Sequence, residues 1–142
     1  MRHLITVFCF FAALFAANAH ADEAQAESCL KNKIWEGYDQ GFAVRSMMSA
    51  SLGHGENKVY LVTLYSGNEY QFLACADGDT TNVDLVLYDA LGNKIAADTT
   101  TDREPRLTHS PTATDTFYLA VHISGVLKAG VKVGVASAVT YK

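Results

Sequence analysis

The sequence predicts an all-β fold: an antiparallel, jelly-roll-like β-sandwich of seven or eight strands, preceded by a short N-terminal helix. The first observation is the segment Lys58–Asp89, in which three apolar runs of strand length are separated by two sets of turn residues. The second is the alternation within residues 59–64, 83–88 and 117–123, where apolar side chains recur at every other position. This period of two, with many β-branched and aromatic residues, is typical of half-buried strands. Short strands at this spacing, joined by turns rich in Gly and Asp, indicate a sandwich.

Residues 1–21 have the pattern of a secretory signal peptide. The start is positively charged, Leu4–Ala17 is an apolar run, and Ala19-His20-Ala21 has the small-x-small form of a cleavage site. We expect a mature chain with an N-terminal segment over residues 22–44 and the sandwich over residues 45–142. The protein is therefore expected to be exported, to the periplasm or outside the cell, with no membrane attachment after cleavage.

The charge of the chain excludes some partners. Eleven Lys and Arg residues stand against fifteen Asp and Glu residues, which gives a net charge of −4, and the basic residues do not cluster. Binding to nucleic acid or to anionic lipid depends on a concentration of positive charge. We therefore expect a protein or a cell-wall or extracellular glycan as the partner.

Two cysteines remain after removal of the signal peptide, Cys29 and Cys75. Pairs of cysteines in exported proteins usually oxidise, so a Cys29–Cys75 disulfide is expected. The alternative is a pair of free buried thiols. A zinc site is disfavoured because two cysteines without nearby histidines fall short of four ligands.

The residues around Cys29 predict the helix. Leu30, Ile34 and Tyr38 recur every four positions, with Trp35 beside them, which places them along one stripe of a helix over Ser28–Gly37. The polar residues before this segment, 22–27, are expected to be loose.

The strands can be followed along the chain. Residues 58–65 and 70–76 are predicted to pair as a hairpin around Ser66–Glu69, because Gly67 and Asn68 tolerate the positive φ of a tight turn. The other expected elements are a first strand over residues 42–51, a short strand over 94–97, an exposed loop over 98–104, an edge strand or extended connection over 106–110 between Pro105 and Pro111, and strands over 117–123 and 131–135.

The predicted hairpin has one outer face too apolar to face water. Val59, Leu61, Leu73 and Cys75 all point away from the core in this arrangement. We therefore expect the N-terminal helix to pack on this face, to be held there by the disulfide, and to shield Trp35 from solvent.

Three segments carry a resemblance to a known family. VYLVTLYSGNEYQF, DLVLYDALGNKIAAD and SPTATDTFYLAV, in this order within Arg45–Ile123, resemble the bacterial pre-peptidase C-terminal domain, a jelly-roll-like sandwich often appended to secreted proteases. Members of that family commonly have Gly at the position of Asp115. A looser similarity connects the chain with periplasmic inhibitors of lysozymes, but Thr114–Phe117 does not match the Ser-Gly-x-Tyr pattern of their inhibitory loop.

Several aspartates could provide oxygen ligands at one end of the sandwich. Calcium prefers such carboxylates, and relatives of the resembled fold can bind it near loops that connect strands. The alternative is that these residues form turns by accepting hydrogen bonds from their own backbone, and we favour it. No other cofactor is expected. The candidate ligands are Asp77, Asp79, Asp84, Asp98 and Asp102.

No catalytic residue is predicted. His54, His109 and His122 could each be drawn into a hydrolytic triad, but no Gly-x-Ser-x-Gly elbow is present, and nothing in the pattern brings a nucleophile, a base and an orienting group together. The chain is therefore expected not to be an enzyme.

Tyr65, Tyr88 and Tyr118 alternate away from the predicted core, so they could form an aromatic patch for a protein or glycan. The alternative is that they cover neighbouring strands, which needs no partner. Two functions follow. The first is an exported, non-catalytic binding module that uses these tyrosines or the loops Asp77–Asn82 and Asp98–Glu104. The second is an inhibitor of an exported lysozyme or protease.

Overall fold

The computed structural model describes residues 21–142, which form one helix and eight strands. The predicted signal peptide falls almost wholly on residues 1–20, which lie outside the described residues. Within residues 21–142, no helix is both long and apolar enough to span a membrane. The elements are α1 (Glu23–Tyr38), β1 (Ala43–Leu52), β2 (Asn57–Leu64), β3 (Tyr70–Ala76), β4 (Thr80–Tyr88), β5 (Lys94–Asp98), β6 (Arg106–His109), β7 (Asp115–Val126) and β8 (Val133–Tyr141).

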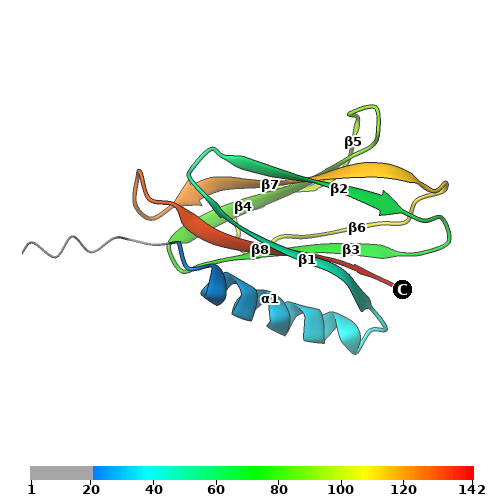
Figure 1. Cartoon of the computed structure of the whole chain (residues 1–142), viewed down its shortest axis with the longest axis horizontal. Helices are drawn as coiled ribbons and strands as arrows, with labels where there is room; N and C mark the ends of the chain where they lie inside the picture. Colours follow the sequence, from blue (N-terminus) through cyan, green and yellow to red (C-terminus); the bar gives the residue numbers. More distant parts are fainter. Residues whose placement is uncertain (1–20) are drawn as a thin grey trace, which may run out of the picture.

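The strands form two four-stranded antiparallel sheets that face each other (Figure 1). One sheet has the order β1-β8-β3-β6 and the other has the order β2-β7-β4-β5. The predicted all-β sandwich with a short helix is thus confirmed. Its core lies between the sheets, where the alternate residues of β4 and β7, among them Leu85, Leu119 and Val121, meet Phe72 and Val139 of the opposite sheet.

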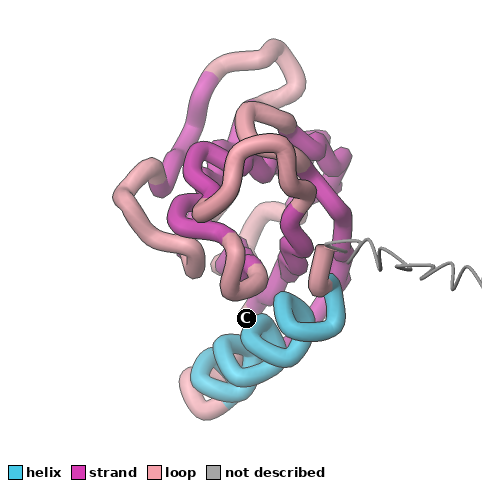
Figure 2. Tube along the Cα trace, turned by 90° about the vertical axis from the view of Figure 1, so that its left-hand side faces the viewer, coloured by secondary structure: helices cyan, strands magenta, loops and turns pink. Residues whose placement is uncertain are grey.

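Helix α1 covers the outer face of the sheet that contains β3 and β8 (Figure 2). The helix and this face form a second, smaller core. It explains why every residue of β3 is buried, although only alternate residues face the sandwich interior. Gly134 of β8 permits the close approach, because a Cβ at this position would lie 2.5 Å from the backbone of Asp22 and Glu23. The buried residues of this core are Ala26, Leu30, Leu73, Cys75, Ala136 and Ala138.

The helix begins earlier than predicted. The carboxylate of Asp22 accepts a hydrogen bond from the backbone N–H of Gln25 at 2.8 Å, which satisfies one of the free donors of the first turn. Residues 23–27 are therefore helical, and the prediction that residues 22–27 are loose was wrong. The capping role of Asp22 was the overlooked signal.

The predicted pairing of residues 58–65 with 70–76 was also wrong. β2 pairs with β7, whereas β3 pairs with β8 and β6, so Ser66–Glu69 connects the two sheets. Gly67 does take the expected positive φ, at 89°. Turn residues indicate that the chain reverses, but they do not decide whether the next strand lies beside the previous one or across the core from it.

This topology divides the apolar face that the helix was expected to cover. Leu73 and Cys75 of β3 do lie beneath α1, but Val59 and Leu61 of β2 lie on the outside of the other sheet, 53% and 64% exposed. The expected shielding of Trp35 is wrong as well, since its side chain is 65% exposed. The helix buries Ala26, Leu30 and Ile34, and Trp35 lies on an adjacent face of the helix.

Candidate binding surfaces

Two of the three predicted tyrosines lie side by side. Tyr88 of β4 and Tyr118 of β7 are direct cross-strand partners, and Leu61 of β2 lies opposite Tyr118 on its other side. A second row runs from Val59 through Ala120 to Val86. We call the apolar part of this outer surface of the β2-β7-β4-β5 sheet the open face, and its residues are Val59, Leu61, Val86, Tyr88, Tyr118 and Ala120.

The open face contrasts with the covered face of the other sheet. Helix α1 packs against β8, β3 and β1, all in the sheet opposite the open face. Tyr88 and Tyr118 are each half-buried, because each covers its cross-strand neighbour, while Leu61 beside them remains 64% exposed. The tyrosines therefore both pack locally and contribute to a continuous apolar surface.

Tyr65 belongs to a different site, at the end of the sandwich where β2 passes to β3. There a cavity of about 350 Å³ is lined by residues from β1, the β2–β3 connection, β3 and β8. We call it the Arg45 pocket, and its lining residues are Val44, Arg45, Tyr65, Asn68, Tyr70 and Tyr141.

The hydroxyl of Tyr70 organises this pocket. Tyr70 is 1% exposed, and its oxygen accepts hydrogen bonds from the backbone N–H of Tyr65 at 2.9 Å, from Nδ2 of Asn68 at 3.3 Å and from Nη1 of Arg45 at 3.4 Å. Arg45 also donates to the backbone carbonyl of Thr63, and its guanidinium carbon lies 5.2 Å from the ring centre of Tyr65. Sequence reasoning missed Arg45, because its position depends on a bulge in β1.

The aspartates do not form one cluster. Asp77 is 1% exposed, and its carboxylate accepts hydrogen bonds from the backbone N–H groups of Asp22, Gly134 and Asp79 and from the hydroxyl of Thr80. In residues 21–142, no three of the five candidate ligands bring their oxygens within 4.8 Å of one another. Calcium binding by these residues stays a prediction.

The other candidate ligands mostly serve local structure. Asp98 accepts hydrogen bonds from the hydroxyl of Thr100 at 2.6 Å and from the backbone N–H of Arg106 at 2.9 Å. Burial raises the pKa of Asp98, but these hydrogen bonds together outweigh it, so the pKa lies below its usual value. Asp102 accepts a hydrogen bond from the backbone N–H of Glu104, as expected for a turn residue.

The two predicted loops do come together. The backbone N–H groups of Ala76 and Val83 donate to the carbonyls of Arg103 and Asp102, so the 98–104 loop spans from β3 to β4 across the end of the sandwich. The backbone N–H of Asp102 also donates to the side chain of Asn82 at 3.1 Å. Several polar groups of these loops thus make their hydrogen bonds within the chain.

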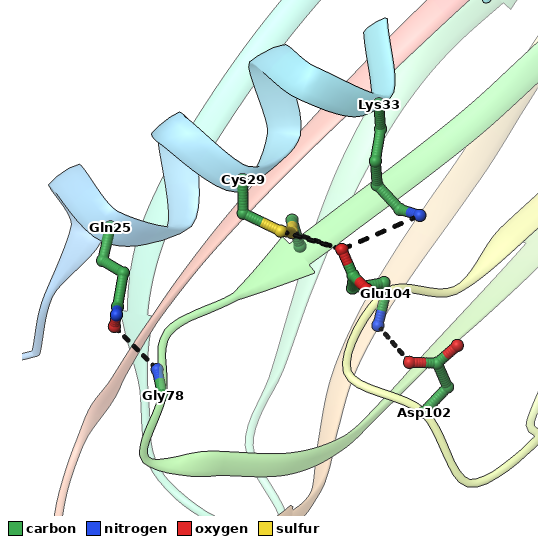
Figure 3. The surroundings of a disulfide bond; sticks show 7 residues. Gln25, Cys29, Lys33, Gly78, Asp102 and Glu104 are labelled. Atoms are coloured by element: carbon green, nitrogen blue, oxygen red, sulfur yellow. Dashed lines mark hydrogen bonds and ion pairs between the residues drawn. A yellow bond between two sulfur atoms is a disulfide. The ribbon is translucent and has the colours of Figure 1, made fainter. Parts of the chain in front are cut away.

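The predicted disulfide between Cys29 and Cys75 is present, with 5.9 Å between the two Cα atoms (Figure 3). Oε1 of Glu104 lies 3.0 Å from the sulfur of Cys29 and 3.9 Å from Nζ of Lys33. These two cysteines and Glu104 are the one group of three metal-ligand residue types gathered in residues 21–142. Because the disulfide occupies both sulfurs, the group holds the helix to β3 and does not offer a metal site.

In residues 21–142, none of the three histidines is hydrogen-bonded to the side chain of a nucleophile. His54 is in the β1–β2 turn, with Nε2 3.2 Å from the carbonyl of Ser124, and His122 lies outward on β7 opposite Asp84. His109 of β6 packs on the ring of Phe117, and burial lowers its pKa. Among the described residues, none of these rings is hydrogen-bonded to a serine hydroxyl or a carboxylate, so no triad geometry forms around them.

Comparison with known proteins finds similarity in fold alone. No family model matches the chain, and no curated protein sequence matches it either. Among solved structures, a periplasmic inhibitor of g-type lysozyme from Aeromonas hydrophila, PliG, has a TM-score of 0.52 at 12% identity, over 70% of this chain and 88% of that one. The pre-peptidase C-terminal domain of a Bacillus anthracis collagenase has a TM-score of 0.49 at 16% identity, over 68% and 89%. This second structure belongs to the family that the sequence resembles.

Proposed function

We propose that this chain is an exported, non-catalytic binding module that recognises a protein partner through the open face. The observation that carries the proposal is the difference between the two sheets. Helix α1 covers the outside of one sheet, while the outside of the other presents Val59 and Leu61 more than half exposed beside Tyr88 and Tyr118. Contiguous apolar surface of this kind is characteristic of interaction sites.

The composition of the open face favours a protein over a glycan. Its most exposed side chains, Val59 and Leu61, are aliphatic, and such groups gain most from burial against another apolar surface. Tyr88 and Tyr118 each add an aromatic ring that carries a hydroxyl. Tyrosine is frequent among the residues that contribute most to binding at protein interfaces. The sheet beneath is hydrogen-bonded on both sides of β7, so the surface is rigid before binding.

The disulfide supports the exported location, because disulfides form and persist in oxidising compartments. The loops at residues 77–82 and 98–104 are the weaker candidate for the recognition surface. The side chains of Asp77, Asn82 and Asp102 make hydrogen bonds within the chain, so few of their oxygens remain free to bind a partner.

The test compares wild-type protein with Leu61→Lys as immobilised bait for periplasmic or culture-fluid extract. Leu127→Lys is the matched control, because Leu127 is 65% exposed but follows β7 in a turn away from the open face. We expect a protein that wild type and Leu127→Lys both retain and that Leu61→Lys loses, with binding weakened by about 2 kcal/mol or more. Equal retention by all three baits would show that the open face is not the binding site.

The alternative function is inhibition of an exported lysozyme or protease, which the fold shared with the Aeromonas inhibitor supports. It requires a segment of this chain to enter a partner's cleft. Assays of purified protein against g-type and other lysozymes and a panel of proteases test it directly. If Leu61→Lys abolishes inhibition, the open face serves both binding and inhibition. If no enzyme of the panel is inhibited, the alternative function is wrong.

A further inference from the structure

The Arg45 pocket is separate from the open face and has its own chemistry. Its volume of about 350 Å³ lies at the small end of the range for ligand-binding pockets, which suits one compact chemical unit. We propose that this pocket binds a sugar unit that carries a carboxylate. Arg45 pairs with the carboxylate, and the rings of Tyr65 and Tyr141 contact the sugar.

A β-bulge directs Arg45 into the pocket. In the pairing of β1 with β8, Val44 lies opposite Thr140 and Ser46 lies opposite Val139, so Arg45 between them has no partner. A bulge turns the extra side chain away from the regular alternation of the strand, and bulges are frequent beside functional sites. Here the turned side chain reaches across to the carbonyl of Thr63 in the other sheet.

The positive charge of Arg45 is not neutralised within the described part of the chain. Only Nη1 makes hydrogen bonds, to Thr63 and Tyr70, and no carboxylate lies within 4.0 Å of the guanidinium in residues 21–142. The nearby cation Lys142 differs, since its Nζ lies 3.6 Å from a carboxylate oxygen of Glu69. Nη2 and Nε of Arg45 therefore remain as a pair of donors, the geometry that binds a carboxylate through two parallel hydrogen bonds.

Tyr70, the buried polar side chain of the pocket, offers a ligand no free acceptor. The oxygen of Tyr70 already accepts hydrogen bonds from three N–H groups, so its lone pairs are not free for a donor on a ligand. A ligand that supplies acceptors satisfies the free donors of Arg45. A carboxylate does this, whereas an amine or a cation does not.

The walls of the pocket favour a sugar as the body of the ligand. Tyr65 and Tyr141 are 51% and 38% exposed, so each presents an aromatic ring to whatever enters. A pyranose ring has apolar C–H faces that pack on such rings and hydroxyls at its edge that reach solvent or Asn68. Tyrosine is suited to sugar binding because its ring is apolar while its hydroxyl remains hydrated.

The experiment titrates the purified protein with N-acetylmuramic acid and with N-acetylglucosamine, which differ in the lactyl group that carries the carboxylate. Binding is followed by calorimetry and by amide chemical shifts. We expect the acid to bind with shifts concentrated at residues 44–46, 65–70 and 141, and the neutral sugar to bind at least about tenfold more weakly. Equal binding of the two sugars, or shifts elsewhere, would overturn the proposal.

Variants separate charge from shape. Arg45→Gln should weaken binding of the acidic sugar by about tenfold to a hundredfold, and Arg45→Lys by less, because it keeps the charge and loses the paired donors. Lys128→Gln is the control for loss of one positive charge, since Lys128 is exposed in the β7–β8 turn. Tyr65→Ser removes a ring that either sugar would contact and leaves the hydrogen bonds of Arg45 to Thr63 and Tyr70 in place, so it should weaken both sugars.

Two further measurements test whether the ligand is a peptide and whether the two sites are independent. A short peptide with one aspartate tests whether the pocket takes an acidic side chain instead; binding of the peptide without binding of the sugar would overturn the sugar assignment. Leu61→Lys should bind the acidic sugar like wild type, and Arg45→Gln should capture the protein partner like wild type. If binding at one of the two sites is not found, the proposal for the other site is unaffected.

Discussion

The buried carboxylate of Asp77 joins three parts of the chain. Its Oδ2 accepts hydrogen bonds from the backbone N–H of Asp22 at 3.0 Å, just before α1, and from that of Gly134 in β8 at 2.7 Å. Its Oδ1 accepts from Asp79 and Thr80 in the turn after β3. The contacts of Oδ1 belong to the turn after β3, whereas those of Oδ2 connect this turn to α1 and β8.

We expect Asp77→Ala to lower the free energy of unfolding by about 3 kcal/mol, because buried N–H groups would lose a charged acceptor. Urea denaturation measures this. Asp79→Ala is the control, since Asp79 is exposed, and should change stability by about 0.5 kcal/mol or less. Calcium added to wild type tests the other role: a higher melting temperature that Asp77→Ala abolishes would make Asp77 a metal ligand.

His109 is the residue from which we expect a pH effect. Burial lowers its pKa, so in mildly acidic solution the unfolded chain binds a proton that the folded chain resists. Stability from this group is therefore complete above the unfolded pKa of about 6.5 and is lost as the pH falls through the lower folded value.

The melting temperature of wild type should accordingly fall between about pH 7.5 and pH 5, and that of His109→Gln should fall less. His54→Gln serves as the control, because His54 lies exposed in a turn. Parallel pH profiles for wild type and His109→Gln would contradict the assignment to this residue.

At the level of elements, α1 is held by a small apolar contact, by one covalent bond and by polar contacts such as those of Glu23 with Ser51 and of Glu27 with Ser49. Leu30 and Ala26 are fully buried against β3 and β8, but Trp35 and Tyr38 on the same helix are more than half exposed. A helix with so narrow a buried stripe gains little from packing alone. The Cys29–Cys75 disulfide, whose cysteines are 46 positions apart in sequence, compensates by restricting the unfolded chain.

Replacing both cysteines by serine should lower the free energy of unfolding by about 4 kcal/mol in the chain-entropy account, a large part of the total for a small domain. It should also raise the rate of trypsin cleavage at Lys31 and Lys33 in α1, while cleavage at Lys128 in the β7–β8 turn stays unchanged. Trp35→Ala is the control, because its side chain contributes little buried area. Unchanged cleavage of α1 would show that the noncovalent contacts hold the helix without the disulfide.

At the level of the whole molecule, the two sheets face different surroundings. Both contribute one face to the shared core, but α1 covers only the outside of the β1-β8-β3-β6 sheet, as Figures 1 and 2 show. The bulge at Arg45 and the crossing at Ser66–Glu69 then create a pocket at one end, which is lined by one sheet and by the connection between the two sheets. The open face and the Arg45 pocket are thus properties of the assembled sandwich.

Local patterns were sufficient for the elements and the fold class. Alternation in residues 117–123 predicted β7, the prolines around residues 106–110 predicted an edge strand, and the pair Cys29 and Cys75 predicted the disulfide. Each of these depends on neighbours in sequence or on the chemistry of one residue type. The residues Tyr88 and Tyr118 could likewise be recognised as outward-facing, because the alternation of a strand specifies its faces.

Which strands lie beside one another was decided only by the tertiary structure. By sequence alone, Leu61 and Leu73 belonged to one face of a hairpin; in the fold they lie on opposite sides of the molecule, because β2 and β3 enter different sheets. The same decision paired Tyr88 with Tyr118 and brought Arg45 to Tyr65 and Tyr70. A strand's own residues specify which side is apolar, but the partner that buries that side is chosen by packing of the whole core, and this depends on residues distant in sequence.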